Sequence, residues 1–130
     1  MTPTPPAAAP VVTPYVYHAR VDAIHDGDTL TAYISLGFEI AKNAQRIRLL
    51  GLNCPELNTP AGKAAQRWLA AKILGKWVIL QTEKDHDDKF GGRKLGRVWL
   101  GGECINQSLI AAGHAAPWDG QGPKPLPPAT

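Results

Sequence analysis

Three short segments of the chain combine charged side chains with glycine or proline, and these side chains are of types that bind anions and hard cations. The first is Asp-Gly-Asp-Thr at positions 26–29, the second runs from Arg48 to Glu56, and the third is Asp-Lys-Phe-Gly-Gly-Arg at positions 88–93. Carboxylates hold hard cations and orient water, whereas guanidinium groups bind phosphate oxygens. Together the segments offer the groups that a reaction at a phosphate requires.

Phosphodiester hydrolysis needs this combination because the substrate is an anion that repels a nucleophilic water. A bound cation and arginines can offset that charge and the further charge of the transition state. We expect Asp28 to bind a metal ion, Glu56 to act on the water, and Arg48 and Arg93 to bind the phosphate. Each segment alone is common, since Asp-Gly-Asp is usually only a turn. Their coincidence in this order favours one shared site.

The hydrophobic pattern predicts the strands that would position these segments. Five strands are expected, at positions 15–24, 29–36, 45–52, 77–82 and 95–100. The Asp-Gly step between the first two predicts a hairpin turn. Residues 37–44 are expected to form a loop. In the third strand, alternation places Ile47 and Leu49 on one face and Arg46 and Arg48 on the other.

Two helices are expected, one on each side of the last two strands. Thr59 is a suitable N-cap, Pro60 suits the first helical position, and Gly75 suits the residue just past the end. The buried stripe of this helix is expected to be Ala65, Trp68, Leu69 and Ile73. The second helix is expected at 103–112, ending at Gly113.

This order of elements predicts an α+β fold that is mainly β. It is the layout of an OB-fold, a five-stranded barrel with a helix between strands three and four, here with a further C-terminal helix. The 130 residues suit one domain. Five of the twelve prolines lie in 1–14 and four in 119–130, so we expect disordered proline-rich tails there and a folded domain at 15–118.

In combination the segments resemble the staphylococcal nuclease-like (thermonuclease) family. The resemblance covers roughly 16–118 and rests on DGDT at 26–29, RLLGLNCPE at 48–56, DKFGGR at 88–93 and GGECINQSLIAAGHA at 101–115. It implies a calcium-dependent endonuclease that hydrolyses DNA and RNA with little sequence specificity and leaves 3′-phosphates. It also implies the OB-type barrel that the strand order predicts.

The resemblance also implies roles for particular residues. The Ca²⁺ ligands would be Asp28 by its carboxylate, Asn53 by its side-chain oxygen and Cys54 by its backbone carbonyl. The catalytic residues would be Arg48, Glu56 and Arg93.

Further residues would support the site or contact the substrate. Asp26 would support the metal ligands without binding the metal itself, and Lys89 and Trp118 would bind the substrate. Trp118 can stack on a base or pack against the barrel, and Tyr33, on the polar face of the second strand, is a weaker candidate for stacking.

Two departures from the family pattern keep an alternative open. Asn53 stands where the family usually has Asp, which removes one negative charge from the expected cation site. The third segment carries Gly91 and Gly92 where one glycine is commoner, and Phe90 where a tyrosine is frequent. The alternative is a weakly active or inactive module of the same fold that binds nucleic acid or a protein partner without cutting.

Other charged and aromatic residues have ordinary explanations. The first helix and its end carry only basic charges, Lys63, Arg67, Lys72 and Lys76, which suit a nucleic-acid track but more often form a solvated face. The acidic stretch at 83–88 is expected to be a solvated loop. Trp68, Trp77 and Trp99 are expected in the core.

Composition excludes several classes of protein. The net charge of +3 suits an anionic partner such as DNA or RNA, and no apolar run approaches the length of about 20 residues that spans a membrane. Cys54 and Cys104 are expected to be free thiols. No secretory signal is visible, which favours a cytoplasmic protein over a secreted one. A monomer is expected.

Overall fold

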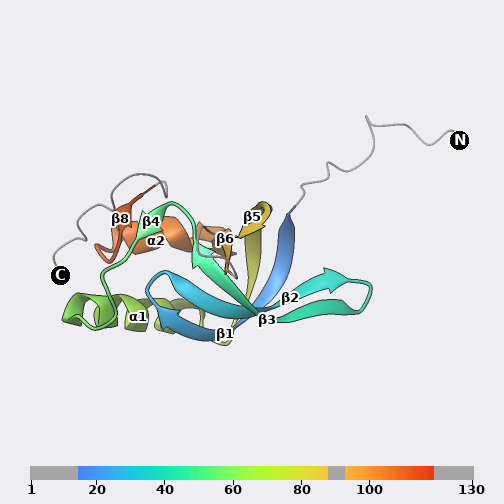
Figure 1. Ribbon diagram of the computed structural model, residues 1–130, viewed down its shortest axis with the longest axis horizontal. Helices are drawn as coiled ribbons and strands as arrows, with labels where there is room; N and C mark the ends of the chain where they lie inside the picture. The colour runs from blue at the N-terminus through green and yellow to red at the C-terminus, as the bar shows by residue number, and fades with distance from the viewer. Residues whose placement is uncertain (1–14, 88–92, 119–130) are drawn as a thin grey trace, which may run out of the picture.

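Five strands close into a barrel in the part of the chain that the computed structural model describes, residues 15–87 and 93–118 (Figure 1). They are β1 (Val16–Asp26), β2 (Thr29–Gly37), β3 (Ile40–Leu49), β5 (Trp77–Asp87) and β6 (Arg93–Leu100). Neighbours pair antiparallel in the order β3-β2-β1-β5-β6, and a parallel pairing of β3 with β6 closes the barrel. The expected OB-type fold is confirmed. The predicted tails lie outside the described residues.

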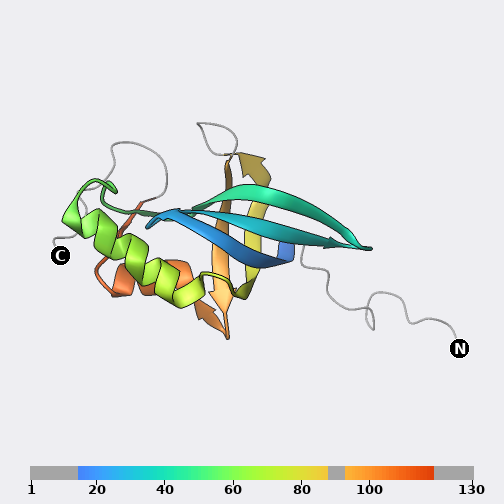
Figure 2. The ribbon, with the colours of Figure 1, turned by 90° about the horizontal axis from the view of Figure 1, so that it is seen from below.

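Two helices and three short strands complete the described part of the chain. Helix α1 (Pro60–Ile73) lies between β3 and β5, and α2 (Ile105–Ala111) follows β6. The two helices lie near one another on one side of the barrel, as Figure 2 shows. Strand β4 (Leu52–Asn53) pairs with β8 (Ala116–Pro117), and β7 (Glu103–Cys104) pairs with the end of β6. No described helix is long and apolar enough to cross a membrane.

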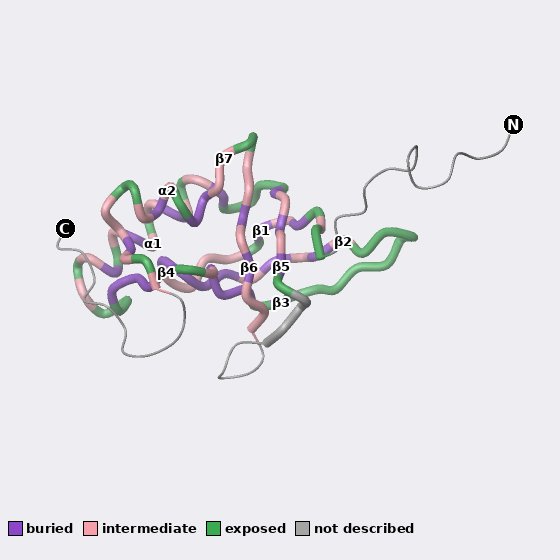
Figure 3. The backbone as a smooth tube through the Cα atoms, turned by 90° about the horizontal axis from the view of Figure 1, so that it is seen from above, coloured by how far each residue is buried: buried purple, intermediate pink, exposed green. Residues whose placement is uncertain are grey.

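The core follows from strict alternation along the strands. Leu30, Ala32 and Ile34 of β2 and Val78 and Leu80 of β5 are buried, whereas the residues between them are more exposed or polar. In Figure 3 the buried segments gather where the strands cross beside the helices, and the outer half of the β2–β3 hairpin is exposed. Burial of one face of each strand against the helices therefore fixes the register of the barrel.

Helix α1 begins and ends where the sequence predicts. The Thr59 hydroxyl accepts a hydrogen bond from the Gly62 N–H at 3.0 Å, Pro60 is the first helical residue, and Gly75 has φ +77° just past the end. Three residues of the predicted stripe are fully buried (Ala65, Leu69 and Ile73), and Trp68 is partly buried against the core.

The predicted loop at 37–44 is wrong because β3 begins at Ile40. The small and polar residues at 41–44 gave no strand signal, yet Ala41 and Lys42 pair with β2, and the hairpin projects beyond the barrel (Figure 1). Phe38 and Glu39 turn the chain with φ of 54° and 62°, and Phe38 is 99% exposed. The strand also ends at Leu49 rather than at position 52, and β4 forms separately by pairing with β8, a strand that was not predicted.

Three further expectations are corrected. Strand β5 continues to Asp87, so positions 83–87 of the acidic stretch are strand and not loop, while position 88 lies outside the described residues. Trp77 is 51% exposed and therefore not a core residue, and Trp99, which is half-buried, is not part of the core cluster either. Helix α2 begins at Ile105, after β7, rather than at 103. Both cysteines are free, as expected.

A buried amide on α2 joins the helix to the barrel. Asn106 is 2% exposed, and its side chain accepts from the Val98 N–H at 3.0 Å and donates to the carbonyls of Leu50 at 2.9 Å and Gly96 at 3.1 Å. These backbone groups belong to β6 and to the turn after β3. One side chain thus satisfies three backbone groups.

Replacing Asn106 by leucine is expected to lower the free energy of unfolding by about 2–4 kcal/mol, because each buried polar group left without a partner costs about 1–3 kcal/mol. The measurement is urea unfolding followed by circular dichroism. Gln107→Leu, at the neighbouring exposed position, is the matched control and should change stability little. Equal midpoints for the two variants would contradict this role of Asn106.

Candidate active site

The carboxylate of Asp28 joins the turn at 26–29 to the segment at 48–56. It is 8% exposed, in the turn between β1 and β2. Its Oδ2 accepts from the backbone N–H of Cys54 at 3.2 Å and lies 3.1 Å from Arg48 Nη1, and its Oδ1 accepts from the Thr29 hydroxyl at 3.2 Å. The predicted residues Asp28, Arg48 and Cys54 are therefore in direct contact.

Arg48 is buried although it belongs to the polar face of β3. Its Cα partner is Thr29, and the Leu49 N–H donates to the Asp28 carbonyl at 2.8 Å, so the register brings β3 directly beside the turn. The guanidinium contacts Asp28 and donates from Nη1 to the Leu49 carbonyl at 3.4 Å. An arginine on a strand is ordinarily solvated, and this one is 9% exposed because its carboxylate partner is itself buried.

Asp26 lies next to Asp28 and carries the clearest electrostatic signature of the site. Its Oδ1 accepts from the Asp28 N–H at 3.0 Å. Burial, with the hydrogen bond and charge of the Asp28 carboxyl, raises the pKa of Asp26 to about 6, although the Arg48 charge opposes this shift. Asp26 therefore keeps its proton to a higher pH than an exposed aspartate does.

The segment that follows β4 supplies the remaining predicted ligands. Asn53 is 7% exposed, and its amide makes no hydrogen bond to the described residues, while its backbone pairs with Ala116. Cys54 is buried, and burial, followed by the charges of Asp28 and Asp26, raises the pKa of its thiol. The thiol therefore stays protonated, and Cys54 contributes backbone groups rather than a nucleophile.

The first turn and the segment after β4 pack closely against α1, and a glycine lies at each of the two contacts. A Cβ added at Gly27 would lie 2.7 Å from the Ala65 Cβ and 2.8 Å from the Cys54 sulfur. A Cβ added at Gly62 would lie 1.9 Å from the Glu56 carbonyl oxygen. That carbonyl also accepts from the Thr59 N–H and hydroxyl. The backbone of Glu56 is thus fixed at the start of α1 while the residue itself is exposed.

The other predicted site residues have different outcomes. Arg93 is half-buried at the start of β6, and its Cα partner in the parallel pairing is Arg46, two residues before the level of Arg48. The Trp118 N–H donates to the Gly51 carbonyl at 2.9 Å, which anchors the end of the domain beside β4. Lys89, like Phe90 and the Gly91-Gly92 pair, lies outside the described residues.

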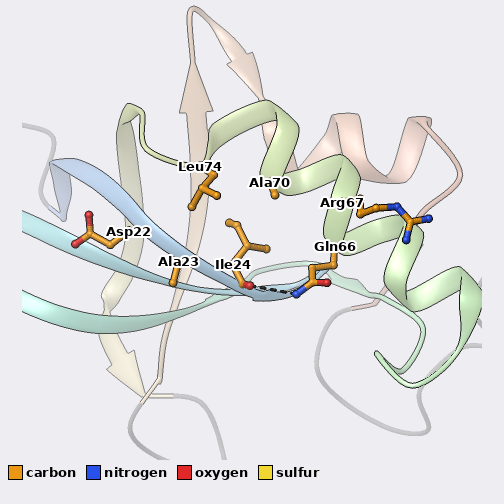
Figure 4. A pocket seen from close by; sticks show the side chains of 7 residues that line it. All are labelled: Asp22, Ala23, Ile24, Gln66, Arg67, Ala70 and Leu74. Atoms are coloured by element: carbon orange, nitrogen blue, oxygen red, sulfur yellow. Dashed lines mark hydrogen bonds between the residues drawn. The ribbon is translucent and has the colours of Figure 1, made fainter.

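The structure reveals residues that sequence reasoning missed. Gln66 donates from Nε2 to the carbonyl of Ile24 (Figure 4) and to that of His25, which ties α1 to the end of β1. A polar residue on the helix face that packs on β1 is a signal that could have singled it out. Thr29 is another missed residue, since its hydroxyl contacts Asp28.

The groove drawn in Figure 4 lies on the α1 side of β1 and contains none of the predicted site residues. Its volume is about 420 Å³. It is lined by Asp22, Ala23, Ile24, Gln66, Arg67, Ala70 and Leu74. The candidate site is therefore not this groove but the polar cluster around Asp28.

The oxygen donors around Asp28 suit a hard cation. Asp28 Oδ1 accepts one hydrogen bond and keeps lone pairs, and Asp26 adjoins it. Asn53 directly precedes Cys54, whose backbone N–H contacts Asp28. Carboxylate, amide and carbonyl oxygens are the ligands that Ca²⁺ prefers. Within the described ranges there is no cluster of three or more His, Cys, Asp or Glu residues that could hold a metal ion, so such a site would depend on Asn53 and on backbone oxygen.

Comparison with known proteins identifies a family to which the chain is similar. Residues 46–123 match the family model described as staphylococcal nuclease homologue. The chain is 31% identical over 102 residues to a thermonuclease of Staphylococcus hyicus and 31% identical over 99 residues to an uncharacterized endonuclease of Escherichia coli O157:H7. It is 29% identical over 103 residues to a staphylococcal-like nuclease of Arabidopsis thaliana.

The chain is shorter than these relatives. The matched part covers 74–75% of this chain but 56% of the Staphylococcus hyicus protein, 59% of the Escherichia coli protein and 30% of the Arabidopsis thaliana protein. It therefore spans about half the length of the two bacterial relatives and less of the plant one.

The raised pKa of Asp26 predicts a pH dependence of stability in the presence of a metal chelator. The folded protein holds this proton more tightly than the unfolded chain, with a pKa of about 6 against the ordinary 3.8. The resulting stability is fully present below pH 3.8 and is lost as the pH rises through 6. Urea midpoints measured from pH 4 to 7 should fall less in Asp26→Asn than in the wild type.

Asp22→Asn is the matched control, since this carboxylate lies on the same strand and pairs with Arg20 at the surface. It should leave the slope of the wild type in place. If Asp26→Asn and the wild type lose stability in parallel over this range, the electrostatic account of the Asp26–Asp28 pair is wrong.

Proposed function

The chain belongs to the staphylococcal nuclease homologue family, and we propose from this that it is a calcium-dependent nuclease that hydrolyses phosphodiester bonds of DNA and RNA with little sequence specificity. The contact of Asp28 with both Arg48 and the Cys54 backbone carries the proposal, because it brings the expected metal ligands beside an expected phosphate ligand. The nuclease names of relatives at about 30% identity support the same reaction class.

The proposed chemistry divides among residues of the site. Asp28, Asn53 and the Cys54 carbonyl would hold Ca²⁺, which when bound would polarise the phosphate and offset its charge. Asp26 supports Asp28 through the hydrogen bond to its backbone. Glu56, exposed on the loop before α1, takes the proton of the attacking water.

The arginines act on the phosphate. Arg48 and Arg93 belong to the paired strands β3 and β6 and stabilise the charge that develops on the phosphate oxygens. Departure of the 5′-oxygen leaves a 3′-phosphate. Lys89 and Trp118 are proposed to contact the rest of the substrate.

Cleavage of single-stranded DNA should require Ca²⁺ and stop with a chelator. Glu56→Gln is expected to lower the rate roughly 10²–10⁴-fold, as for loss of a general base. Arg93→Ala should lower it roughly 10²-fold, as for loss of a group that stabilises transition-state charge. Rates are measured from end-labelled fragments on denaturing gels, which also report the 3′-phosphate ends.

Matched controls are Glu103→Gln, whose carboxylate pairs with Lys72, and Arg97→Ala on β6. Both should cleave at the wild-type rate. Cleavage that is equal with Ca²⁺ and with chelator, or absent at every Ca²⁺ concentration, would refute the proposal. Salt-sensitive binding of intact oligonucleotide would then favour the alternative of a binding module, which the missing charge at Asn53 motivates.

Asn53→Asp tests the assignment of that residue to the cation. Adding a carboxylate should lower the Ca²⁺ concentration needed for half-maximal cleavage, since affinity in oxygen sites rises with ligand charge. It should also increase the stabilisation of the fold by a fixed Ca²⁺ concentration, a readout independent of cleavage. Asn43→Asp, at an exposed position of β3, should change neither quantity, and equal behaviour of the two variants would show that Asn53 does not hold the ion.

A further inference from the structure

An aromatic and cationic cluster crosses the outer wall of the barrel. Arg20 of β1 is the Cα partner of Tyr33 in β2 and of Trp77 in β5, so the three side chains share one face. The Arg20 guanidinium carbon lies 4.7 Å from the Tyr33 ring centroid and 5.9 Å from that of Trp77. The two rings meet edge to face at 6.1 Å.

The cluster holds Trp77 at the surface rather than burying it. Trp77 remains 51% exposed, while Arg20 donates from Nε to Asp22 Oδ1 at 2.7 Å and is thereby oriented over the Tyr33 ring. A half-exposed tryptophan is accessible to a ligand, and nucleic-acid bases stack on aromatic side chains irrespective of sequence.

The same wall leads to the candidate active site. Thr29, Thr31 and Tyr33 alternate along β2 and therefore project from one face, and Thr29 is the Cα partner of Arg48. Four residues along β2 and three strand spacings from β3 to β5 separate Arg48 from Trp77. At standard strand rise and spacing this path along the barrel surface is roughly 20 Å. It is longer than a dinucleotide, since successive nucleotides of one strand rise about 3.4 Å.

A positive charge lies on β3 two residues from Arg48, in the direction of the level of Tyr33. Arg46 is exposed and is the Cα partner of Thr31. Thr31 Oγ1 lies 2.6 Å from His25 Nε2, and burial, together with the charge of Arg46, lowers the pKa of His25. Because it is exposed and lies beside Thr31, Arg46 is placed to bind a backbone phosphate that follows the wall from Arg48 toward Trp77.

We propose that this wall, defined by Arg46, Tyr33, Arg20 and Trp77, is a second contact for single-stranded DNA or RNA outside the bond that is cut. A base stacks on Trp77 and a phosphate pairs with Arg46. The orientation of the strand toward Arg48 rests on the proposed function, whereas the binding itself does not require cleavage.

The test is binding of fluorescein-labelled dT12 and of a labelled thymidine dinucleotide, followed by fluorescence anisotropy in the presence of chelator so that neither is cut. Trp77→Leu keeps apolar bulk but removes the ring, and it should weaken dT12 binding about 5- to 100-fold, the factor expected for one lost stacking contact. Trp77→Tyr keeps a ring and should restore most of the affinity. The dinucleotide should bind equally to wild type and Trp77→Leu.

Phe38→Ala is the matched control, because it removes a fully exposed aromatic from the tip of the β2–β3 hairpin, and it should bind dT12 as the wild type does. Arg46→Ala should weaken dT12 binding and flatten its salt dependence. Urea unfolding of each variant identifies any general loss of structure. Wild-type affinity in a folded Trp77→Leu, equal effects of Trp77→Leu and Phe38→Ala, or no binding of dT12 by the wild type would overturn the proposal.

The two proposals fail separately. Binding that depends on Trp77 in a protein that never cleaves would sink the nuclease function and leave this contact standing. Calcium-dependent cleavage, together with dT12 binding that Trp77→Leu does not change, would refute this contact and leave the nuclease function standing.

Discussion

The buried carboxylate of Asp28 is the constraint on which the rest of the site depends. A carboxylate removed from water must be paired and hydrogen-bonded, and here its partners are Arg48 on β3, the Cys54 N–H after β4 and the adjacent Thr29 hydroxyl. These groups meet only if β2 and β3 pair in the observed register and the segment after β4 returns to the first turn. The geometry of the candidate site therefore depends on the register of β2 and β3, because only that register gives the buried Asp28 carboxylate its partners.

Helix α1 makes that arrangement possible by coming unusually close. The missing side chains at Gly27 and Gly62 let the helix approach the first turn and the Glu56 carbonyl, and Gln66 satisfies two carbonyls at the end of β1. The same packing limits water around the carboxyls, which raises the pKa of Asp26. The close packing of α1 therefore accounts both for the contacts of the site and for the raised pKa of Asp26. A bound cation would offset the charge of the two neighbouring carboxyls.

The features that depend on residues close in the chain were predicted from the sequence. Alternation gave the first hairpin, and the Thr59 cap and Gly75 gave the limits of α1, because these signals act over a few residues. The sequence could not predict pairing between distant segments, so β8 was missed. The strand character of 41–44 was missed for another reason, because these small and polar residues carry no alternating hydrophobic pattern. Contact of Asp28 with Arg48 and Cys54 agrees with the grouping that the resemblance implied, but the burial of Arg48 depends on tertiary packing and was not foreseen.

The error at Trp77 has a physical reason that bears on function. Hydrophobicity alone favoured the core, but alternation with Val78 and Leu80, which are buried, requires the first residue of β5 to face outward. The same alternation places Arg46 and Arg48 on the outer face of β3. A barrel whose inner face is filled by aliphatic residues therefore carries these charged and aromatic side chains on the outer face of its strands. At one end of that face Asp28 neutralises an arginine, and at the other Arg20 orients an exposed indole.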